Sequence, residues 1–384
     1  FAGDSVINYV NEGLDMSAEV KNSYYGGDHW GNVIWSMYNN NIPDNFQYYK
    51  NDGRKKEFNL FARAQYKLGR HFVLYSELQY RNINYKMRGI DKDFFPLSNN
   101  RKYNFVNGKI GLTYNLDKNN SFYLSASLAN RDPSRSDIKE SIKSERGDDI
   151  KSERLLDYEI GYKYITGNFT AMANLYLMEY KNQLVATGKL SETGHVIKQN
   201  VPDSYRRGIE LVLGWQPISS LRLDGNLTLS KNKIKKYTSF IDTYDNPNDW
   251  TPLAQTQIYY KKSNIAFSPE YTAMLMLTCK PYKDISFSLS NKFVGKQYMD
   301  NSSLAEAKVP AYMTASFNAS KCIRLQNGSK LVFSGTVDNL FNNKYYAYGW
   351  IYRALFADGS KQHLEQGVYP QAEINFIFRI AYEF

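Results

Sequence analysis

The chain has 384 residues, 33 of them Tyr and 21 Phe, yet its mean hydropathy of -0.56 is polar. Its formal charge of +10 comes from 48 basic and 38 acidic residues that are dispersed along the chain, which disfavours a basic nucleic-acid-binding helix. No run of about 18 apolar residues is present, which excludes an ordinary transmembrane helix. Many aromatic residues on a polar chain are typical of a transmembrane β-barrel, whose strands face lipid on one side and water on the other.

The N-terminal region gives the weakest pattern. The chain begins with Phe1, without an initiating Met or an apolar leader, so either a signal peptide has been removed or a longer N-terminal portion is missing. Only one strand is expected before residue 57, near 29–38. Cys279 and Cys322 both lie in strand-like runs further on; a disulfide between them is possible, and a structural role is favoured over a catalytic one.

Alternation with a period of two dominates the rest of the chain. In 221–230, Leu side chains at odd positions oppose Arg, Asp, Asn, Thr and Ser at even positions, and 121–128 and 285–292 repeat this pattern. Such alternation predicts strands with one apolar and one polar face. The expected hairpins are 58–68 with 72–85, 102–114 with 121–130, 155–164 with 168–181, 205–216 with 221–234, 269–280 with 285–296, and 311–322 with 330–338, followed by a last strand from about 372 to Phe384.

The connections between these strands alternate in length. Short turns such as 68–70, 166–167 and 326–328 are followed by long segments, and sorting of this kind is typical of outer-membrane barrels. Long structureless segments usually carry function. The expected long loops are 39–57, 86–101, 131–154, 182–204, 235–268, 297–310 and 339–371.

Charged residues fall on the polar faces of the expected strands. In a β-sandwich these charges would be buried in the core at a high cost in free energy, whereas in a wide barrel they face a polar interior. They are Arg63, Glu77, Arg81, Glu159, Lys163, Arg222 and Asp224. Because an open sheet edge cannot stand in lipid, the roughly fourteen strands must close on themselves or on strands outside this sequence. The sequence therefore predicts an all-β, transmembrane, antiparallel up-and-down β-barrel.

Several segments resemble the TonB-dependent receptor family. Val337–Tyr346 is similar to its "V-x-N-L-F-x-x-x-Y" element, and Tyr205–Leu211 to a strand start of the form "s-x-G-x-E". Phe293–Asn301 is similar to "Y-V-G-x-x-Y-x-D-N". Tyr369-Pro370 followed by 373–384 resembles the closing strand of the family.

A further pair of elements resembles the family's "R-x-P" and "P-E-x-x-x-x-Y-E-x-G" motifs. The first is 130–134 and the second begins at Glu153 and continues through 157–161. Ser152 stands where Pro is common, which is a mild departure. The resemblance covers most of the chain from about residue 58 onward.

The resemblance implies a 22-stranded barrel in the bacterial outer membrane, with a plug domain inside it. Residues 1–384 would supply about 14 of those strands as one C-terminal barrel portion, with the plug absent. It also implies partners: the TonB-ExbB-ExbD complex through the missing N-terminal portion, outer-membrane lipid and lipopolysaccharide, and a surface lipoprotein. The barrel assembly machinery would recognise the C-terminal strand, with Tyr382 and Phe384 as the assembly signal.

Catalytic and metal motifs were sought and not found. The sequence has no G-x-S-x-G, Walker A or H-E-x-x-H pattern. Its four histidines, His29, His71, His195 and His363, lack metal-ligand spacing, so each is interpreted as solvated or structural. The acidic pair Asp148-Asp149 is interpreted as part of a solvated loop. The chain is therefore not expected to be an enzyme, and no cofactor or metal is expected.

The best ligand candidates are aromatic and cationic residues of the two longest expected loops. Such residues dominate binding hot spots because they bury much area with little loss of entropy, and Arg pairs bidentately with anionic oxygen. The competing interpretation for each is a girdle or packing role. The predicted ligand-binding residues are Trp250, Tyr259, Tyr260, Tyr348, Trp350, Tyr352 and Arg353.

These observations predict TonB-energised uptake of a scarce nutrient, such as a ferric chelate or a cobalamin-like vitamin, without covalent chemistry by the barrel. The principal alternative is a passive porin-type channel. An adhesin-like surface barrel and a soluble β-rich enzyme are less favoured.

Overall fold

The computed structural model describes the whole chain except residues 1, 12, 39–40, 144–149, 191–195 and 327. The chain divides into two compact units. Unit 1 comprises 1–114 and 125–156, and unit 2 comprises 115–124 and 157–384. Strands β6 (Asn120–Arg131) and β7 (Glu153–Ile165) contribute residues to both units.

Unit 1 is an antiparallel meander in which consecutive strands are neighbours. The predicted hairpin of 58–68 with 72–85 is confirmed, because Leu68 pairs with Phe72 and the ladder runs without a shift as far as Lys50 and Ile90. Gly69 makes this turn possible with φ of 67°, a left-handed conformation that other residues rarely adopt. The strands are β1 (Ala2–Asn11), β2 (Leu14–Val33), β3 (Phe46–Leu68), β4 (Phe72–Ile90) and β5 (Pro96–Asn115).

The two faces of this meander differ as the alternation predicts. Leu60 and Leu78 are exposed on one face, as expected of side chains that meet lipid. On the other face, Arg81 Nε lies 2.8 Å from Glu57 Oε1, in an ion pair that is only about one-fifth exposed. One face is therefore suited to lipid and the other to a polar interior.

Several expectations for unit 1 were wrong. In place of a single strand near 29–38, the N-terminal region contains β1 and a much longer β2, which stops at Val33. The loops expected at 39–57 and 86–101 are largely strand, because β3 begins at Phe46 and β4 continues to Ile90. Beyond a membrane, both faces of a strand meet water, so the apolar alternation ends although the hydrogen-bonded ladder continues.

The expected loop 131–154 contains a helix, α1 (Arg135–Lys143), that the sequence analysis missed. Ser134 caps it: the Ser134 hydroxyl donates to Asp137 Oδ2 at 2.6 Å, and the Asp137 N–H donates back to Ser134 Oγ at 3.2 Å. This Ser-x-x-Asp arrangement is a variant of the capping box and was the available signal. Ile138, a residue of this helix, is fully buried. Asp148 and Asp149 lie outside the described residues.

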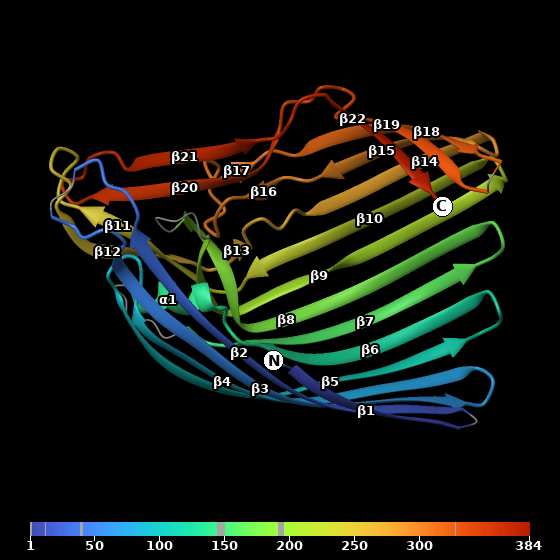
Figure 1. Ribbon diagram of the computed structural model, residues 1–384, viewed down its shortest axis with the longest axis horizontal. Helices are drawn as coiled ribbons and strands as arrows, with labels where there is room; N and C mark the ends of the chain where they lie inside the picture. Colours follow the sequence, from blue (N-terminus) through green and yellow to red (C-terminus); the bar gives the residue numbers. More distant parts are fainter. Residues whose placement is uncertain (1, 12, 39–40, 144–149, 191–195, 327) are drawn as a thin grey trace. The chain divides into compact units, whose positions relative to one another are not determined.

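Unit 2 contains the second meander (Figure 1). Three predicted hairpins are confirmed by register: 205–216 with 221–234, 269–280 with 285–296, and 311–322 with 330–338. The last strand begins at Asn375 rather than 372 and pairs with β19. The strands are β8 (Phe169–Leu190), β9 (Val196–Ile218), β10 (Leu221–Ile234), β14 (Tyr271–Tyr282), β15 (Ile285–Val294), β18 (Tyr312–Arg324), β19 (Lys330–Asp338) and β22 (Asn375–Glu383).

The long connections of unit 2 are not structureless, which corrects a further expectation. β8 and β9 extend through most of 182–204. The connections 235–268 and 339–371 together form a four-stranded sheet in the order β12-β11-β20-β21, here called the loop sheet. Its strands are β11 (Tyr237–Tyr244), β12 (Pro252–Tyr260), β20 (Tyr346–Phe356) and β21 (His363–Pro370). The connections 235–268 and 297–310 also contain three short strands outside this sheet: β13 (Ser263–Asn264), β16 (Gln297–Tyr298) and β17 (Lys308–Val309).

Cys279 and Cys322 are both free thiols, so the possible disulfide is not formed. They lie on β14 and β18, which are separated by β15 in the sheet. No helix among the described residues is long and apolar enough to cross a membrane.

Candidate ligand-binding site in the long connections

The loop sheet brings together residues that are about 100 positions apart in the sequence. β11 pairs with β20 in parallel, so that Tyr244 lies opposite Phe356 and Asp242 opposite Ala354. All seven predicted ligand-binding residues lie in or beside this sheet. Tyr348, Trp350, Tyr352 and Arg353 are on β20, Tyr259 and Tyr260 end β12, and Trp250 precedes it.

Trp250 and Tyr352 belong to one aromatic cluster. The Trp250 ring lies 4.9 Å from Tyr244, 5.2 Å from Phe356 and 5.0 Å from His363, measured between ring centroids. The Tyr352 and Tyr244 hydroxyls are hydrogen-bonded at 3.0 Å. Burial is the main cause that raises the pKa of the Tyr352 hydroxyl, and this hydrogen bond raises it further, so the hydroxyl remains a neutral donor. The cluster fastens β11, β20 and β21 together, which is a packing role.

The other aromatic candidates divide into exposed and packed side chains. Tyr259 and Tyr348 are 75% and 60% exposed, so both are available to a ligand. Tyr260 is partly buried against Tyr237 and the apolar cluster beneath it. Trp350 lies over Gly367, its cross-strand partner, where a Cβ atom would come within 2.3 Å of the indole nitrogen. Tyr260 and Trp350 therefore organise the sheet.

Arg353 has free hydrogen-bonding capacity. Its Nη2 atom donates to Gln362 Oε1 at 3.2 Å, while Nε and Nη1 are buried and have no hydrogen-bond partner among the described residues. A buried guanidinium with unmatched donors is costly unless a ligand completes it. Arg353 is thus the strongest anion-binding candidate of the seven.

Beside Arg353 lies a buried polar group that the sequence analysis did not identify. Asp300 accepts hydrogen bonds from the Ser302 N–H at 3.0 Å and the Ser302 hydroxyl at 2.6 Å. Asn301 accepts from the Ala266 N–H at 2.8 Å and donates to the Ala186 carbonyl. The Asp-Asn pair that ends the 293–301 element was the available signal, and it ties three connections of unit 2 together.

Burial raises the pKa of Asp300, and the Ser302 hydrogen bonds and the positive charge of Arg353 offset only part of that rise. A raised folded-state pKa favours the protonated form, so the local stability around Asp300 should fall as the pH rises above the ordinary value of 3.8 and through the raised one.

Asp300→Asn should abolish this dependence of local stability on pH. Hydrogen exchange of 297–309 across acid pH would measure it, with the exposed carboxyl variant Asp358→Asn as the control; an unchanged pH profile in Asp300→Asn would contradict the assignment.

In unit 1, helix α1 is held by charges on the polar face of the meander. Asp91 Oδ2 lies 2.6 Å from Lys139 Nζ and 3.1 Å from Lys143 Nζ, and Arg135 donates to Asn51. Burial alone would raise the pKa of Asp91, but the two ammonium groups lower it overall. The two halves of the resemblance at 130–134 and 153–161 also meet here, because Arg131 Nη2 lies 2.7 Å from Glu153 Oε2.

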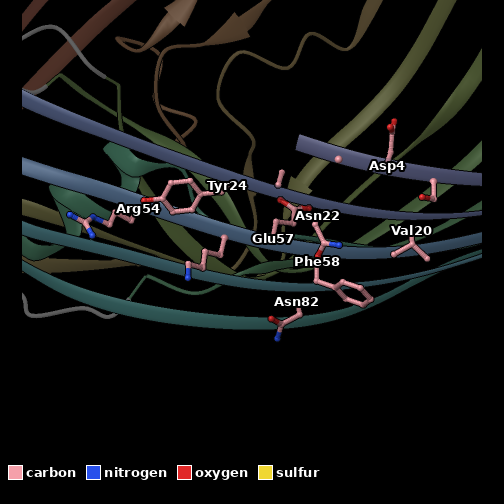
Figure 2. A pocket seen from close by; sticks show the side chains of 12 residues that line it. Asp4, Val20, Asn22, Tyr24, Arg54, Glu57, Phe58 and Asn82 are labelled. Atoms are coloured by element: carbon pink, nitrogen blue, oxygen red, sulfur yellow. The ribbon is translucent and has the colours of Figure 1, made fainter. Parts of the chain in front are cut away.

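A groove in unit 1 contains none of the predicted binding residues. It has a volume of about 780 Å³ and is lined by residues of β1 to β4 (Figure 2). Phe58 and Asn82 extend from one side of the sheet and Asp4 from the other. Its lining draws on both faces of the sheet, and none of the described residues that line it is a buried cation with unmatched donors, so it is a weaker candidate than the loop sheet.

The described part of the chain contains no group of three His, Cys, Asp or Glu residues placed to hold a metal ion. His363 packs in the aromatic cluster, and His71 lies against the Tyr114 ring at 6.1 Å. His195 falls outside the described residues.

The sequence matches the family described as TonB dependent receptor-like, beta-barrel, over residues 2–340. The chain belongs to this family. The predicted fold and location are thereby confirmed: it is an all-β, antiparallel up-and-down β-barrel protein of the bacterial outer membrane. Its family and structural neighbours are receptors and transporters.

Solved structures share this fold. The copper transporter OprC aligns with a TM-score of 0.71 at 16% identity, covering 100% of this chain and 56% of OprC. The ferric-catecholate import receptor Fiu from E. coli K12 (closed form) gives 0.65 at 16%, covering 100% and 54%. The ferric citrate transporter FecA gives 0.66 at 13%, covering 100% and 53%. The chain thus spans about half the length of these proteins, and no curated protein gives a significant match.

Proposed function

We propose that the chain is the barrel portion of a receptor for TonB-energised uptake of a scarce nutrient, such as a ferric chelate or a cobalamin-like vitamin. The observation that carries the proposal is the loop sheet, in which Arg353 keeps unmatched donors and Tyr259 and Tyr348 remain exposed. An arginine with unmatched donors and exposed tyrosines suit an anionic chelate whose chelating groups are planar. The metal, where there is one, is cargo, and the barrel does no covalent chemistry.

The partners follow from the same proposal. Residues 1–384 act as one barrel domain around a plug that couples to the TonB-ExbB-ExbD complex. Tyr382 and Phe384 serve as the signal for the barrel assembly machinery; their rings lie 4.9 Å apart and Phe384 is fully exposed. Outer-membrane lipid, lipopolysaccharide and a surface lipoprotein are the remaining proposed partners.

Uptake by cells tests the proposal against a passive channel. Cells producing the full-length receptor should accumulate a radiolabelled ligand, chosen from ferric citrate, a ferric catecholate and cyanocobalamin, only when the proton-motive force and TonB are intact. A protonophore or a tonB deletion should abolish accumulation. Uptake that continues at the same rate under both treatments would contradict energised transport and favour a porin.

A further inference from the structure

Strands β8, β9 and β10 of unit 2 carry a continuous apolar band on one face. Leu229 pairs with Ile209, and Ile209 with Leu175, so these three side chains form one row across the strands. Leu227, Leu211 and Ala173 form the next row, and Leu175 is 53% exposed. The opposite face carries Arg222 paired with Asp224. The apolar band is therefore the lipid-facing side of the sheet.

Basic residues follow this band directly, on the same face and toward the long connections. Arg207 lies between Leu177 and Lys231 in the register, and Tyr205 lies between Glu179 and Lys233. Because strand side chains alternate, these odd-numbered residues continue the face of the Leu rows, about 7 Å further along for each pair of residues. The outer basic cluster consists of Lys181, Arg207, Lys231, Lys233, Lys235 and Lys262.

A buried tyrosine forms the base of the outer basic cluster. The Tyr205 ring is 5% exposed, and three cations surround it: Arg207 Cζ at 4.6 Å, Lys262 Nζ at 5.8 Å and Lys235 Nζ at 5.9 Å from the centroid. Attraction between cations and the ring face holds these like charges together. They remain concentrated in one place although they repel one another.

The acidic residues nearby do not neutralise the cluster. Glu179 lies 2.7 Å from Lys235, and Asp203 pairs with Lys181. Lys233 donates to Asn264. Arg207, Lys231 and Lys262 have no carboxylate within ion-pair distance among the described residues, and all three are exposed. Positive charge is therefore left over at the boundary between the apolar band and water.

We infer that the outer basic cluster binds the phosphate groups of an anionic lipid headgroup in the outer leaflet. Lipid phosphates lie at this boundary, beside the apolar band that the acyl chains cover. Arg207 offers bidentate hydrogen bonds to a phosphate, and the lysines add further charge. A membrane-anchored phosphate is present beside the cluster at high local concentration, so it should occupy the cluster more fully than a free phosphate does. The inference rests on the outer-membrane location and on no particular imported ligand.

Native mass spectrometry of the full-length receptor released from detergent tests this inference. The probes are a bisphosphorylated lipid A and, as the neutral comparison, phosphatidylcholine. The triple variant Arg207→Ser/Lys231→Ser/Lys262→Ser should reduce lipid A adducts about tenfold or more, because each cation near an anionic surface contributes substantially to binding. Inorganic phosphate at millimolar concentration should compete weakly.

Matched variants separate this effect from net charge and misfolding. Lys118→Ser/Lys280→Ser/Lys283→Ser removes three exposed cations from the short-turn end and should leave the adducts unchanged. Arg207→Lys/Lys231→Arg/Lys262→Arg preserves charge and should restore binding. Equal loss in both triple serine variants, equal adducts with phosphatidylcholine, or complete displacement by inorganic phosphate would overturn the inference. Failure of the uptake experiment would leave this result unaffected, so the two proposals fail independently.

Discussion

Replacing Arg353 with alanine is expected to weaken ligand binding by the full-length receptor at least tenfold. Its Nε and Nη1 atoms are buried without a partner among the described residues, so a ligand oxygen placed there would gain two charge-assisted hydrogen bonds. Truncation of a central interface arginine commonly costs about 2 kcal/mol or more. The dissociation constants for ferric citrate, a ferric catecholate and cyanocobalamin, measured by calorimetry, check the prediction.

Two variants control this measurement. Arg324→Ala removes an exposed arginine that lies 3.5 Å from Asp284 near a short turn, and it should not change affinity. Arg353→Lys keeps the charge but loses the planar fork, so it should bind with intermediate affinity. If Arg353→Ala binds the responsive ligand as tightly as the wild type, Arg353 is a structural residue only.

Asp91→Ala is expected to release helix α1 from the face of the unit 1 meander. Asp91 is 3% exposed and forms ion pairs with both Lys139 and Lys143, so its removal leaves two partly buried ammonium groups without their shared counter-charge. Breaking such a buried pair costs about 3 kcal/mol. Hydrogen exchange of 135–143 in the full-length receptor should accelerate by about a hundredfold, since about 1.4 kcal/mol corresponds to tenfold.

The pH dependence of the same helix gives a second measurement. Because the folded-state pKa of Asp91 is lowered, its stabilising contribution is present above the ordinary value of 3.8 and is lost as the pH falls through the lowered value. Asp93→Asn is the matched control, because Lys143 also contacts Asp93 while Asp91 keeps both lysines. Unchanged exchange in Asp91→Ala, or equal acceleration in Asp93→Asn, would show that Asp91 does not fasten the helix.

From about residue 58 onward, the sequence alone was sufficient for the membrane-facing strands, whereas β1 and the first half of β2 were missed. From Leu221 to Leu229, one face meets lipid and the other meets a polar interior, so the alternation is complete and predicts both the strand and its orientation. The pairing of strands within each hairpin could also be predicted, because two strands joined by a short turn pair side by side and antiparallel. The motifs around Asn339 and Asp300 indicated the family. In the structure they fix the backbone of a turn and of the long connections; for example, Asn339 donates to the carbonyls of Asn343 and Ala372.

Only the tertiary structure showed what the long connections do. Both faces of β2 beyond Gly26 and of β8 beyond Lys181 carry polar residues, so no alternation indicated that these strands continue. The parallel pairing of Tyr244 with Phe356 joins segments about 100 residues apart, and no local pattern encodes such a contact. The packing of each side chain distinguished structural residues from binding candidates. Four of the predicted binding residues pack within the loop sheet, namely Trp250, Tyr260, Trp350 and Tyr352, whereas Arg353 keeps unmatched donors. Residue type determined that each is able to bind a ligand; burial and neighbours, which depend on distant parts of the chain, decided which ones remain free to do so.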